Sequence, residues 1–189
     1  NVVSWVRAIF AAAVADRVIA ASPAAGLRTP TVPRRAVRPL GPAELDAIAA
    51  ALPARWAVWV ALGAGLGLRR GETFGLTVDQ VDFLRRRVRI DRQLTPDRQI
   101  GPPKTAASVR DIPLPDSVSL ALAEHLRMYG AGRDGLVLSQ QSGSGEAVWW
   151  VTVTRVWQRA VAAAGLAGVR PHDLRHTYAC QRLADGAPP

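Results

Sequence analysis

The chain has 189 residues, enough for one full domain with an attached piece and for a sizeable buried core. Its 49% hydrophobic and 21% charged residues exclude an intrinsically disordered chain, and its single Cys excludes a disulfide scaffold and a zinc site built from several cysteines. The formal net charge of +9 favours a polyanionic partner such as nucleic acid, although many proteins of this charge have no such partner.

The first 22 residues predict one helix. Apolar residues without a helix breaker run from Trp5 to Ala20, and Ser22-Pro23 ends the stretch. Three charged residues interrupt the stretch, namely Arg7, Asp16 and Arg17. We therefore expect neither a signal peptide nor a membrane span, and the single thiol fits a cytoplasmic protein. One helix is too little to fold alone, so we interpret residues 1–22 as the last helix of another domain.

Residues 23–39 predict an extended linker. Four prolines alternate with arginines, a composition typical of a solvated, semi-rigid connection rather than a packed element. Its arginines are candidates for contacts with an anionic partner, above all Arg34, Arg35 and Arg38.

Residues 40–76 predict three helices. Gly41-Pro42 starts a helix that runs to about Leu52, and a second helix follows from Arg55. The core face of this second helix is expected at Trp56, Trp59, Val60 and Leu62. Gly63, Gly65 and Gly67 predict a break before a short helix to Leu76. The glycine spacing fits neither common phosphate-binding loop, and a helix rather than a strand precedes it.

Residues 78–114 predict a small antiparallel meander. Val88 and Ile90 alternate with charged residues, and a further strand is expected over 109–114. Lys104, the only Lys among 24 basic residues, lies in or just after the turn that joins the last two strands. Two interpretations stay open: chance retention at a surface turn, or a role that needs a removable proton, which Arg cannot supply.

The C-terminal part predicts three more helices, at about 116–129, 150–164 and 173–184. His172 and Arg175 are three positions apart near the start of the last helix, so they share a face. Together with free backbone N–H groups they could bind one phosphate, while a capping His and a surface Arg is the simpler alternative. The predicted fold class is mainly α with a small antiparallel β-meander, an α+β domain.

Three sequence boxes in this order are similar to those of the tyrosine recombinase (phage integrase) family. The boxes are Gly67-Leu68-Arg69-Arg70-Gly71-Glu72, then Lys104-Thr105 with Ser108-Val109-Arg110-Asp111-Ile112-Pro113-Leu114, then His172-Asp173-Leu174-Arg175-His176-Thr177. The resemblance runs from about residue 40 to the last residue. It implies a tyrosine-recombinase-like catalytic domain over 40–189, preceded by a linker over 23–39 and the end of a core-type DNA-binding domain over 1–22.

The resemblance also implies a catalytic role for four residues in phosphodiester exchange. Arg69 and Arg175 match the pair that clamps the scissile phosphate with permanently charged guanidinium groups. Lys104 matches a general acid that protonates the departing 5′ oxygen. His172 matches a residue that holds a proton near the attacking oxygen, or alternatively donates a hydrogen bond to the phosphate.

Other residues near the boxes have supporting or structural interpretations. Glu72 is expected to orient or balance Arg69, and a plain surface carboxylate is the alternative. His176 is expected to be a structural hydrogen-bonding residue beside the site. His125 is expected to be an ordinary histidine on a helix surface, and Arg70 to face solvent or a phosphate elsewhere.

No tyrosine of the chain matches the nucleophile of the family. In the family pattern a further His or Trp and then the nucleophilic Tyr follow the last box, whereas this chain contains only Tyr129 and Tyr178. We expect a chain truncated at both ends, or a gene remnant, with a phosphate pocket and no attacking group. Whether it is an enzyme on its own is therefore left open.

The leading hypothesis is a site-specific DNA recombinase or integrase catalytic domain whose partners are double-stranded DNA and other recombinase protomers. The family chemistry implies no metal and no other cofactor. One alternative is a noncatalytic DNA-binding relic that occupies recombination sites, and another is a basic interaction domain in which the boxes are accidental. The target sequence, the biological role and the oligomeric state are not encoded in recognisable motifs, and DNA binding that weakens steeply with salt would separate the first two hypotheses from the third.

Overall fold

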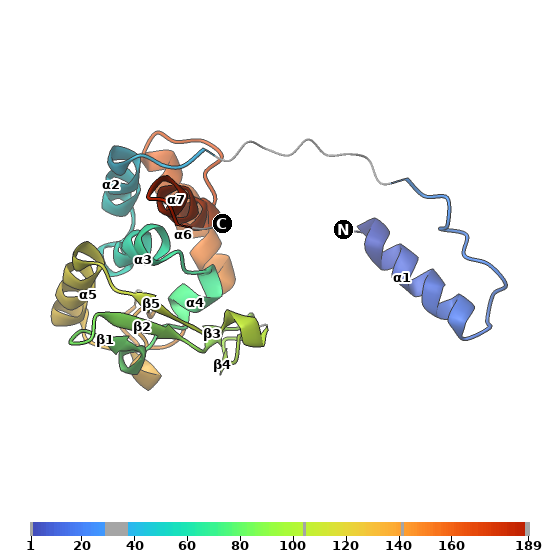
Figure 1. Cartoon of the computed structure of the whole chain (residues 1–189), viewed down its shortest axis with the longest axis horizontal. Helices are drawn as coiled ribbons and strands as arrows, with labels where there is room; N and C mark the ends of the chain where they lie inside the picture. The colour runs from blue at the N-terminus through green and yellow to red at the C-terminus, as the bar shows by residue number, and fades with distance from the viewer. Residues whose placement is uncertain (1, 29–37, 104, 141, 188–189) are drawn as a thin grey trace. The chain divides into compact units, whose positions relative to one another are not determined.

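The structure is a computed structural model that describes residues 2–28, 38–103, 105–140 and 142–187 (Figure 1). The chain divides into two compact units, Asn1–Ala36 and Val37–Pro189, and each is described by itself. Lys104, Arg34 and Arg35, which the sequence singles out, lie outside the described residues.

The first unit contains one helix, α1 (Val2–Ala15). The expected end at residue 20 was wrong because Arg17 adopts a left-handed backbone with φ of 58°, which cannot continue a right-handed helix. The guanidinium of Arg7 donates a hydrogen bond to the carbonyl oxygen of Leu27, so the following segment folds back along the helix. None of the residues of α1 is buried, which fits the expectation that a single helix has no core of its own.

The second unit is mainly helical with a small antiparallel sheet, so the predicted fold class is confirmed. Its described α-helices are α2 (Pro42–Ala51), α3 (Val58–Leu66), α4 (Arg70–Phe74), α5 (Asp116–Tyr129), α6 (Trp150–Ala163) and α7 (Pro171–Ala184). Its short 3-10 turns are η1 (Ala54–Trp56), η2 (Val78–Gln80), η3 (Ala106–Ser108) and η4 (Arg133–Gly135). Its strands are β1 (Val81–Asp82), β2 (Arg87–Ile90), β3 (Gln93–Leu94), β4 (Ile100–Gly101) and β5 (Arg110–Pro113).

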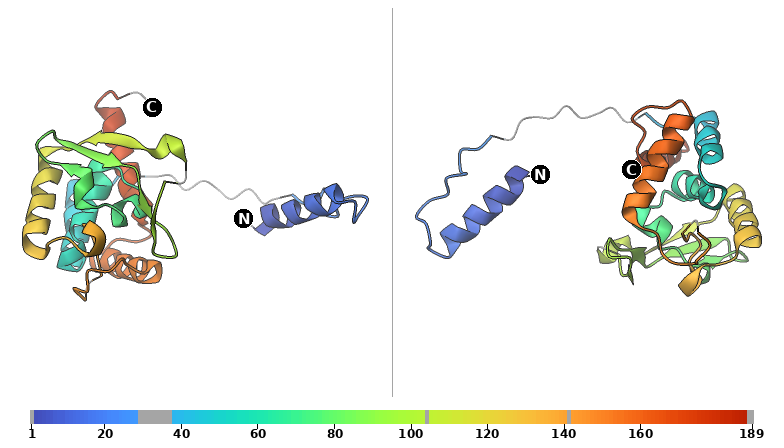
Figure 2. Two further views of the ribbon diagram at one scale, coloured as in Figure 1. Left: turned by 90° about the horizontal axis from the view of Figure 1, so that it is seen from below. Right: turned by 180° about the vertical axis from the view of Figure 1, so that it is seen from behind.

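Helix α3 is the centre of this unit. In Figure 1 and in the right view of Figure 2 the strands lie below α3, α2 and α7 lie above it, and α6 runs alongside it. An added Cβ at Gly63 would lie 2.7 Å from Leu174 of α7, and one at Gly65 would lie 2.4 Å from Val118 of α5. The prediction that these two glycines break the helix was therefore wrong, because they lie inside α3 and let two helices approach it closely. Only Gly67 ends α3, with a φ of 63°.

The predicted meander is present as the sheet β1-β2-β5, in which both pairs of neighbouring strands are antiparallel. Val88 is paired with Val81 on one side and with Ile112 on the other. Val88 and Ile90 are buried while Arg87 and Arg89 are exposed, so one face of the sheet covers the helices. A second hairpin, β3–β4, lies between β2 and β5 in the chain and was not predicted.

An aromatic cluster fills the core between α3, α4 and α6. The ring of Trp59 lies 4.9 Å from that of Phe74 and 4.7 Å from that of Trp157, measured between centroids. The indole N–H of Trp157 donates to the carbonyl of Val169 (3.0 Å), just before α7. Trp56, Trp59, Val60 and Leu62 are all buried, so their predicted core positions are confirmed.

His125 is not a surface histidine, and that expectation was wrong. Only 4% of its surface is exposed, and its Nε2 lies 2.7 Å from the carbonyl oxygen of Val137. The face of α5 that carries His125 is covered by the buried segment Leu136–Leu138, which the helical spacing alone could not show. Burial is the main cause that lowers the pKa of His125.

Helix α7 is fastened at two points to residues far away in the sequence. Leu174 is fully buried against Gly63 of α3. The hydroxyl of Thr177 accepts a hydrogen bond from the backbone N–H of Leu40 (2.9 Å) and donates one to the carbonyl of Asp173 (2.9 Å). The helix that carries His172 and Arg175 is thus held in a fixed orientation over α3.

Candidate functional site

A buried carboxylate, that of Glu72, lies at the centre of the candidate site. Its side chain is 2% exposed, and Oε2 accepts a hydrogen bond from the backbone N–H of Arg69 (2.9 Å). This contact caps the start of α4, whose N-cap residue is Arg69. Oε1 accepts a second bond from Nη1 of Arg69 (2.9 Å). The alternative of a plain surface carboxylate is thereby excluded.

Arg110 of β5 is the second cation on Glu72. Its Nη2 donates to Oε2 (2.8 Å) and its Nη1 to Oε1 (3.0 Å), so the pair is bidentate. Burial alone would raise the pKa of Glu72, but the hydrogen bonds from Arg110 and Arg69 outweigh it and lower the pKa to about 2. Sequence reasoning quoted Arg110 within a box and gave it no role, because 38 positions separate the two partners and only the folded sheet brings them together.

Arg175 reaches the same region from α7. Its Nη1 donates to the carbonyl oxygen of Gly67, two residues before Arg69. The ring of Tyr178 packs against Gly67 so closely that an added Cβ would lie 2.3 Å from its Cδ1. Burial, followed by the nearby positive charge of Arg69, lowers the pKa of Arg175. The turn between α3 and α4 therefore brings two guanidinium groups to one place.

His172 lies in the first turn of α7, and its imidazole is 4.6 Å from that of His176 in an edge-to-face arrangement. Partial burial is the first cause that lowers the pKa of His172, followed by the charges of His176 and Arg175. Arg69 contributes in the same direction, which places His172 within electrostatic range of both arginines. The lowered pKa favours the neutral form of the His172 imidazole, which can accept a proton.

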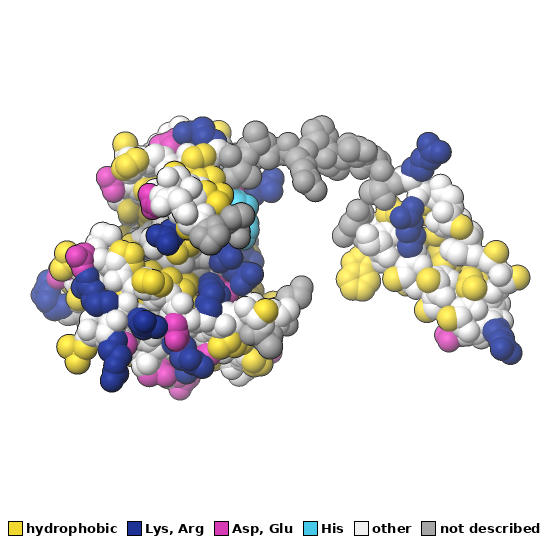
Figure 3. All heavy atoms as spheres, in the orientation of Figure 1, with side chains coloured by type: hydrophobic (Ala, Val, Ile, Leu, Met, Phe, Trp, Pro, Cys, Tyr) yellow, Lys and Arg dark blue, Asp and Glu magenta, His cyan; other side chains and the backbone are white. Residues whose placement is uncertain are grey.

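The structure thus brings Arg69, His172 and Arg175 together, and it adds Arg110 and Glu72. Three guanidinium groups and one carboxylate leave a surplus of two positive charges. Figure 3 shows histidine side chains beside a group of basic side chains on the surface of this unit. An anion is the ligand that such a site favours.

Two cavities lie beside the ion pairs of Glu72, one at its partner Arg110 and one at Glu72 itself. One of about 330 Å³ lies between β5 and α7 and is lined by Arg110, Arg175 and Tyr178, among others. The other, of about 180 Å³, is lined by Arg69 and Glu72 together with Pro103 and Thr105. The two described neighbours of Lys104 in the sequence therefore face Arg69.

The remaining predicted residues lie elsewhere or are already paired. Arg38 makes an ion pair with Glu44, including a 3.0 Å bond between Nη1 and Oε2, and this pairing raises the pKa of Arg38. Arg70 is exposed and lies over the ring of Trp150 at 4.5 Å. Tyr129 lies at the end of α5, next to His125.

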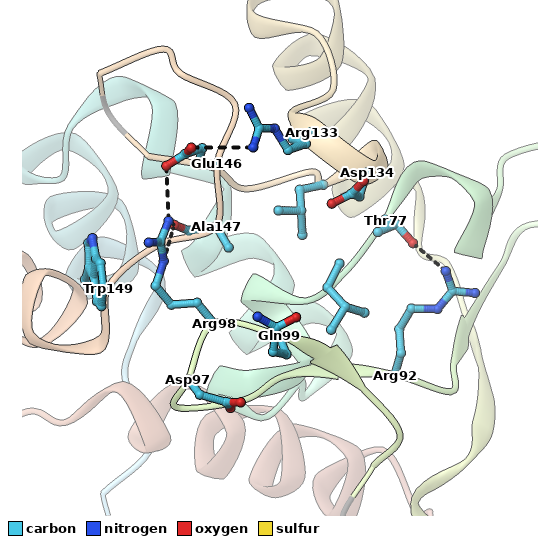
Figure 4. Close-up of a pocket in the computed structure, with 12 residues that line it drawn as sticks. Thr77, Arg92, Asp97, Arg98, Gln99, Arg133, Asp134, Glu146, Ala147 and Trp149 are labelled. Carbon is cyan, nitrogen blue, oxygen red and sulfur yellow. Dashed lines mark hydrogen bonds and ion pairs between the residues drawn. The ribbon is translucent and has the colours of Figure 1, made fainter.

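A larger cavity of about 670 Å³ lies between the β3–β4 hairpin and the segment around residues 133–149 (Figure 4). Arg98 at the tip of the hairpin donates to the carbonyl of Ala147 (2.8 Å), pairs with Glu146 (3.3 Å) and lies 4.1 Å above the ring of Trp149. Arg133 is also within 3.6 Å of Glu146. Arg98 and Arg133 are thus both paired with Glu146, and the contacts of Arg98 attach the β3–β4 hairpin to the segment around residues 133–149.

Among the described residues, no three His, Cys, Asp or Glu side chains gather in an arrangement that could hold a metal ion. No helix in that part of the chain has the length and apolar character needed to cross a membrane.

Comparison with known families gives a match over residues 42–189 to the family described as the phage integrase family. The chain belongs to the phage integrase family. A relative, the putative prophage phiRv2 integrase of Mycobacterium tuberculosis, is 30% identical over 189 residues, which cover 97% of this chain and 50% of that protein. The prophage integrase IntR of Escherichia coli is 31% identical over 144 residues, or 65% of this chain and 35% of that protein. The chain therefore spans half or less of the length of these two relatives.

Solved structures of integrases share the fold of this member of the phage integrase family. The Tn1549 transposon integrase, in complex with a circular intermediate DNA, superposes with a TM-score of 0.79 at 22% identity, covering 96% of this chain and 65% of that chain. A lambda integrase dimer bound to a COC′ core site gives a TM-score of 0.72 at 18% identity, covering 98% of this chain and 66% of that one. At these identities the likeness establishes the tyrosine recombinase catalytic fold.

Proposed function

We propose that this integrase-family chain binds the phosphodiester backbone of double-stranded DNA as part of the catalytic domain of a site-specific recombinase. The observation that carries the proposal is the proximity of Arg69 and Arg175, because Arg175 donates to the carbonyl of Gly67, two residues before Arg69, and the charge of Arg69 acts on Arg175. Two permanently charged, fork-shaped donors suit the nonbridging oxygens of one phosphate. In the transition state of strand exchange they stabilise the charge that develops on those oxygens.

The other site residues fit proton transfers in the same reaction. His172, whose lowered pKa favours the neutral form, accepts or holds the proton of the attacking oxygen. Lys104 donates a proton to the departing 5′ oxygen, a role that the preference for Arg elsewhere in the chain supports. Glu72 orients Arg69. No metal and no other cofactor takes part in this scheme.

The attacking group is not among the residues of this chain in our proposal. Tyr178 packs its ring against Gly67, and Tyr129 lies against His125 on α5. Both are therefore packing residues, and the nucleophile must be supplied from outside these 189 residues. The chain binds DNA, and the noncatalytic occupation of recombination sites is the second function compatible with it.

A covalent-trapping experiment tests this assignment. A nicked suicide duplex is incubated with the chain alone and with the chain plus a relative's C-terminal segment that carries its Tyr, fused or in trans. We expect no covalent protein–DNA adduct in the first case and some in the second. Arg175→Ala should abolish the rescue, whereas Arg127→Ala, which removes an exposed partner of Glu124, should not. An adduct with the chain alone would contradict the assignment and identify Tyr178 or Tyr129 as the nucleophile.

Domain organisation, location and assembly complete the proposal. Residues 1–22 end a core-type DNA-binding domain, residues 23–39 connect the domains and supply Arg34, Arg35 and Arg38 for phosphate contacts, for which Arg38 exchanges its partner Glu44 for a phosphate, and residues 40–189 form the catalytic part. The two units of the structure and the family match from residue 42 support this division. Further protomers assemble on the DNA, and the reaction takes place in the cytoplasm. The lambda integrase dimer on its core site supports the assembly on DNA.

A further inference from the structure

The carboxylate of Glu72 has a hydrogen bond in each of its four accepting directions. Oε1 accepts from the guanidinium groups of Arg69 and Arg110, and Oε2 accepts from Arg110 and from the backbone N–H of Arg69. The two arginines use the carboxylate differently. Arg110 directs both of its terminal nitrogens at Glu72 and adds a bond to the carbonyl of Ser108 (3.0 Å). Among the described contacts, Arg69 gives Glu72 one side-chain bond.

The exposure of the two arginines differs in the same sense. The side chain of Arg69 is 48% exposed, and that of Arg110 is 27% exposed. Arg69 is thus the cation that an incoming anion meets, while Arg110 is turned inward. Arg69 is also the arginine that acts electrostatically on both His172 and Arg175.

A buried carboxylate beside Arg69 creates an electrostatic problem for anion binding. An isolated pair of Arg69 and Glu72 has no net charge, and a phosphate that contacts Arg69 also meets the negative charge of Glu72. A full charge about 6 Å from a phosphate, at an effective dielectric constant of about 40, changes the binding constant about tenfold. A second cation on Glu72 removes this repulsion.

We propose that Arg110 is a positioning residue that balances the charge of Glu72 and so leaves the charge of Arg69 available for a DNA phosphate. The inference rests on the proposed function, because it concerns the same phosphate site. It assigns the role of Arg110 to its charge and not to a contact with DNA. Removal of the charge of Glu72 should therefore make Arg110 dispensable for binding.

A double-mutant cycle in DNA affinity tests this inference. The affinity of the chain for a short fluorescent duplex is measured by anisotropy at low salt. We expect Arg110→Met to weaken binding about tenfold, and Glu72→Gln combined with Arg110→Met to restore it to within about threefold of the original. Arg110→Lys keeps the charge and should stay within about twofold. Arg127→Met, which frees the exposed Glu124, is the matched control and should change nothing.

Folding and contact explanations give different results in this cycle. Arg110→Met leaves a buried, unbalanced carboxylate and can unfold the chain, so thermal melting is followed for each variant. The double variant has no unbalanced buried carboxylate and keeps the measurement possible. If the double variant binds as weakly as Arg110→Met, or if Arg110→Lys does, the charge-balance role is refuted and Arg110 contacts the phosphate or only shapes the site.

The proposed function is tested separately by Arg69→Ala. If the unchanged chain does not bind DNA, or if Arg69→Ala has no effect on binding, the proposed function and this inference both fail. If Arg69→Ala weakens binding but Glu72→Gln does not restore the binding that Arg110→Met loses, only the inference about Arg110 fails.

Discussion

Replacement of Glu72 by Gln should make the stability of the protein depend less on pH. The pKa of Glu72 is about 2 in the folded protein against a usual value of 4.5. Its ionised form is therefore favoured by folding, and the stabilisation is fully present above the unfolded pKa and lost as the pH falls towards 2. The lowered pKa of Glu72 contributes about 3 kcal/mol to the free energy of unfolding at pH 7 and about 1 kcal/mol at pH 3. The difference in unfolding free energy between the original chain and Glu72→Gln should shrink by about 2 kcal/mol between these pH values.

Urea unfolding followed by tryptophan fluorescence provides the measurement, since Trp56, Trp59 and Trp157 are buried and report on the core. Other carboxylates titrate in both proteins, so only the difference between them isolates Glu72. Glu124→Gln is the matched control, because Glu124 also pairs with an arginine but is exposed, and its difference should barely change with pH. A difference for Glu72→Gln that is equal at pH 7 and pH 3 would refute the reasoning.

Three further changes test other parts of the structure. Gly75→Ala should destabilise the protein by about 1–3 kcal/mol in urea unfolding, because the added Cβ would lie 2.3 Å from the backbone N of Leu94. Gly101→Ala is the control and should destabilise it less, because the nearest atom to its Cβ would be 3.6 Å away. Equal losses of stability would contradict this packing. Trp157→Phe removes the donor to the Val169 carbonyl and should cost about 1–3 kcal/mol by the same method, while no loss of stability would show that the bond is unimportant. A triple variant with Ala at the linker positions Arg34, Arg35 and Arg38 should show a weaker salt dependence of DNA binding. An unchanged slope would exclude contacts between the linker and phosphates.

The helices and the meander could be predicted well from periodicity, but close packing could not. The helix predicted over 116–129 begins and ends at the predicted residues, and the helix predicted over 150–164 is one residue shorter. Gly63 and Gly65 were misread as breakers because glycine both ends helices and permits close helix contacts, and only the positions of α5 and α7 distinguish the two uses. The β3–β4 hairpin was missed because each of its strands has two residues, too few for a detectable alternation.

The sequence predicted the site residues that a motif marks, but not those whose role depends on a contact between distant segments of the chain. The motif order identified Arg69, His172 and Arg175, which the fold brings together. The role of Arg110 depends on β5 lying beside α4, a long-range pairing that no local spacing contains. His125 was misplaced for a similar reason, because the segment that covers it follows α5 in the chain and has no helical or strand pattern of its own.

The attachment of α7 to α3 also has a consequence for biosynthesis. Seven of the nine residues of α3 are buried, and Leu174 of α7 covers Gly63 near the middle of the helix. A ribosome makes α3 more than 100 residues before it makes α7, so the side of α3 that α7 covers stays uncovered on the nascent chain over that interval. Apolar surface exposed during synthesis is a site for aggregation and for chaperone binding. The helix that carries His172 and Arg175 is therefore the one that ends the exposure of this side of α3.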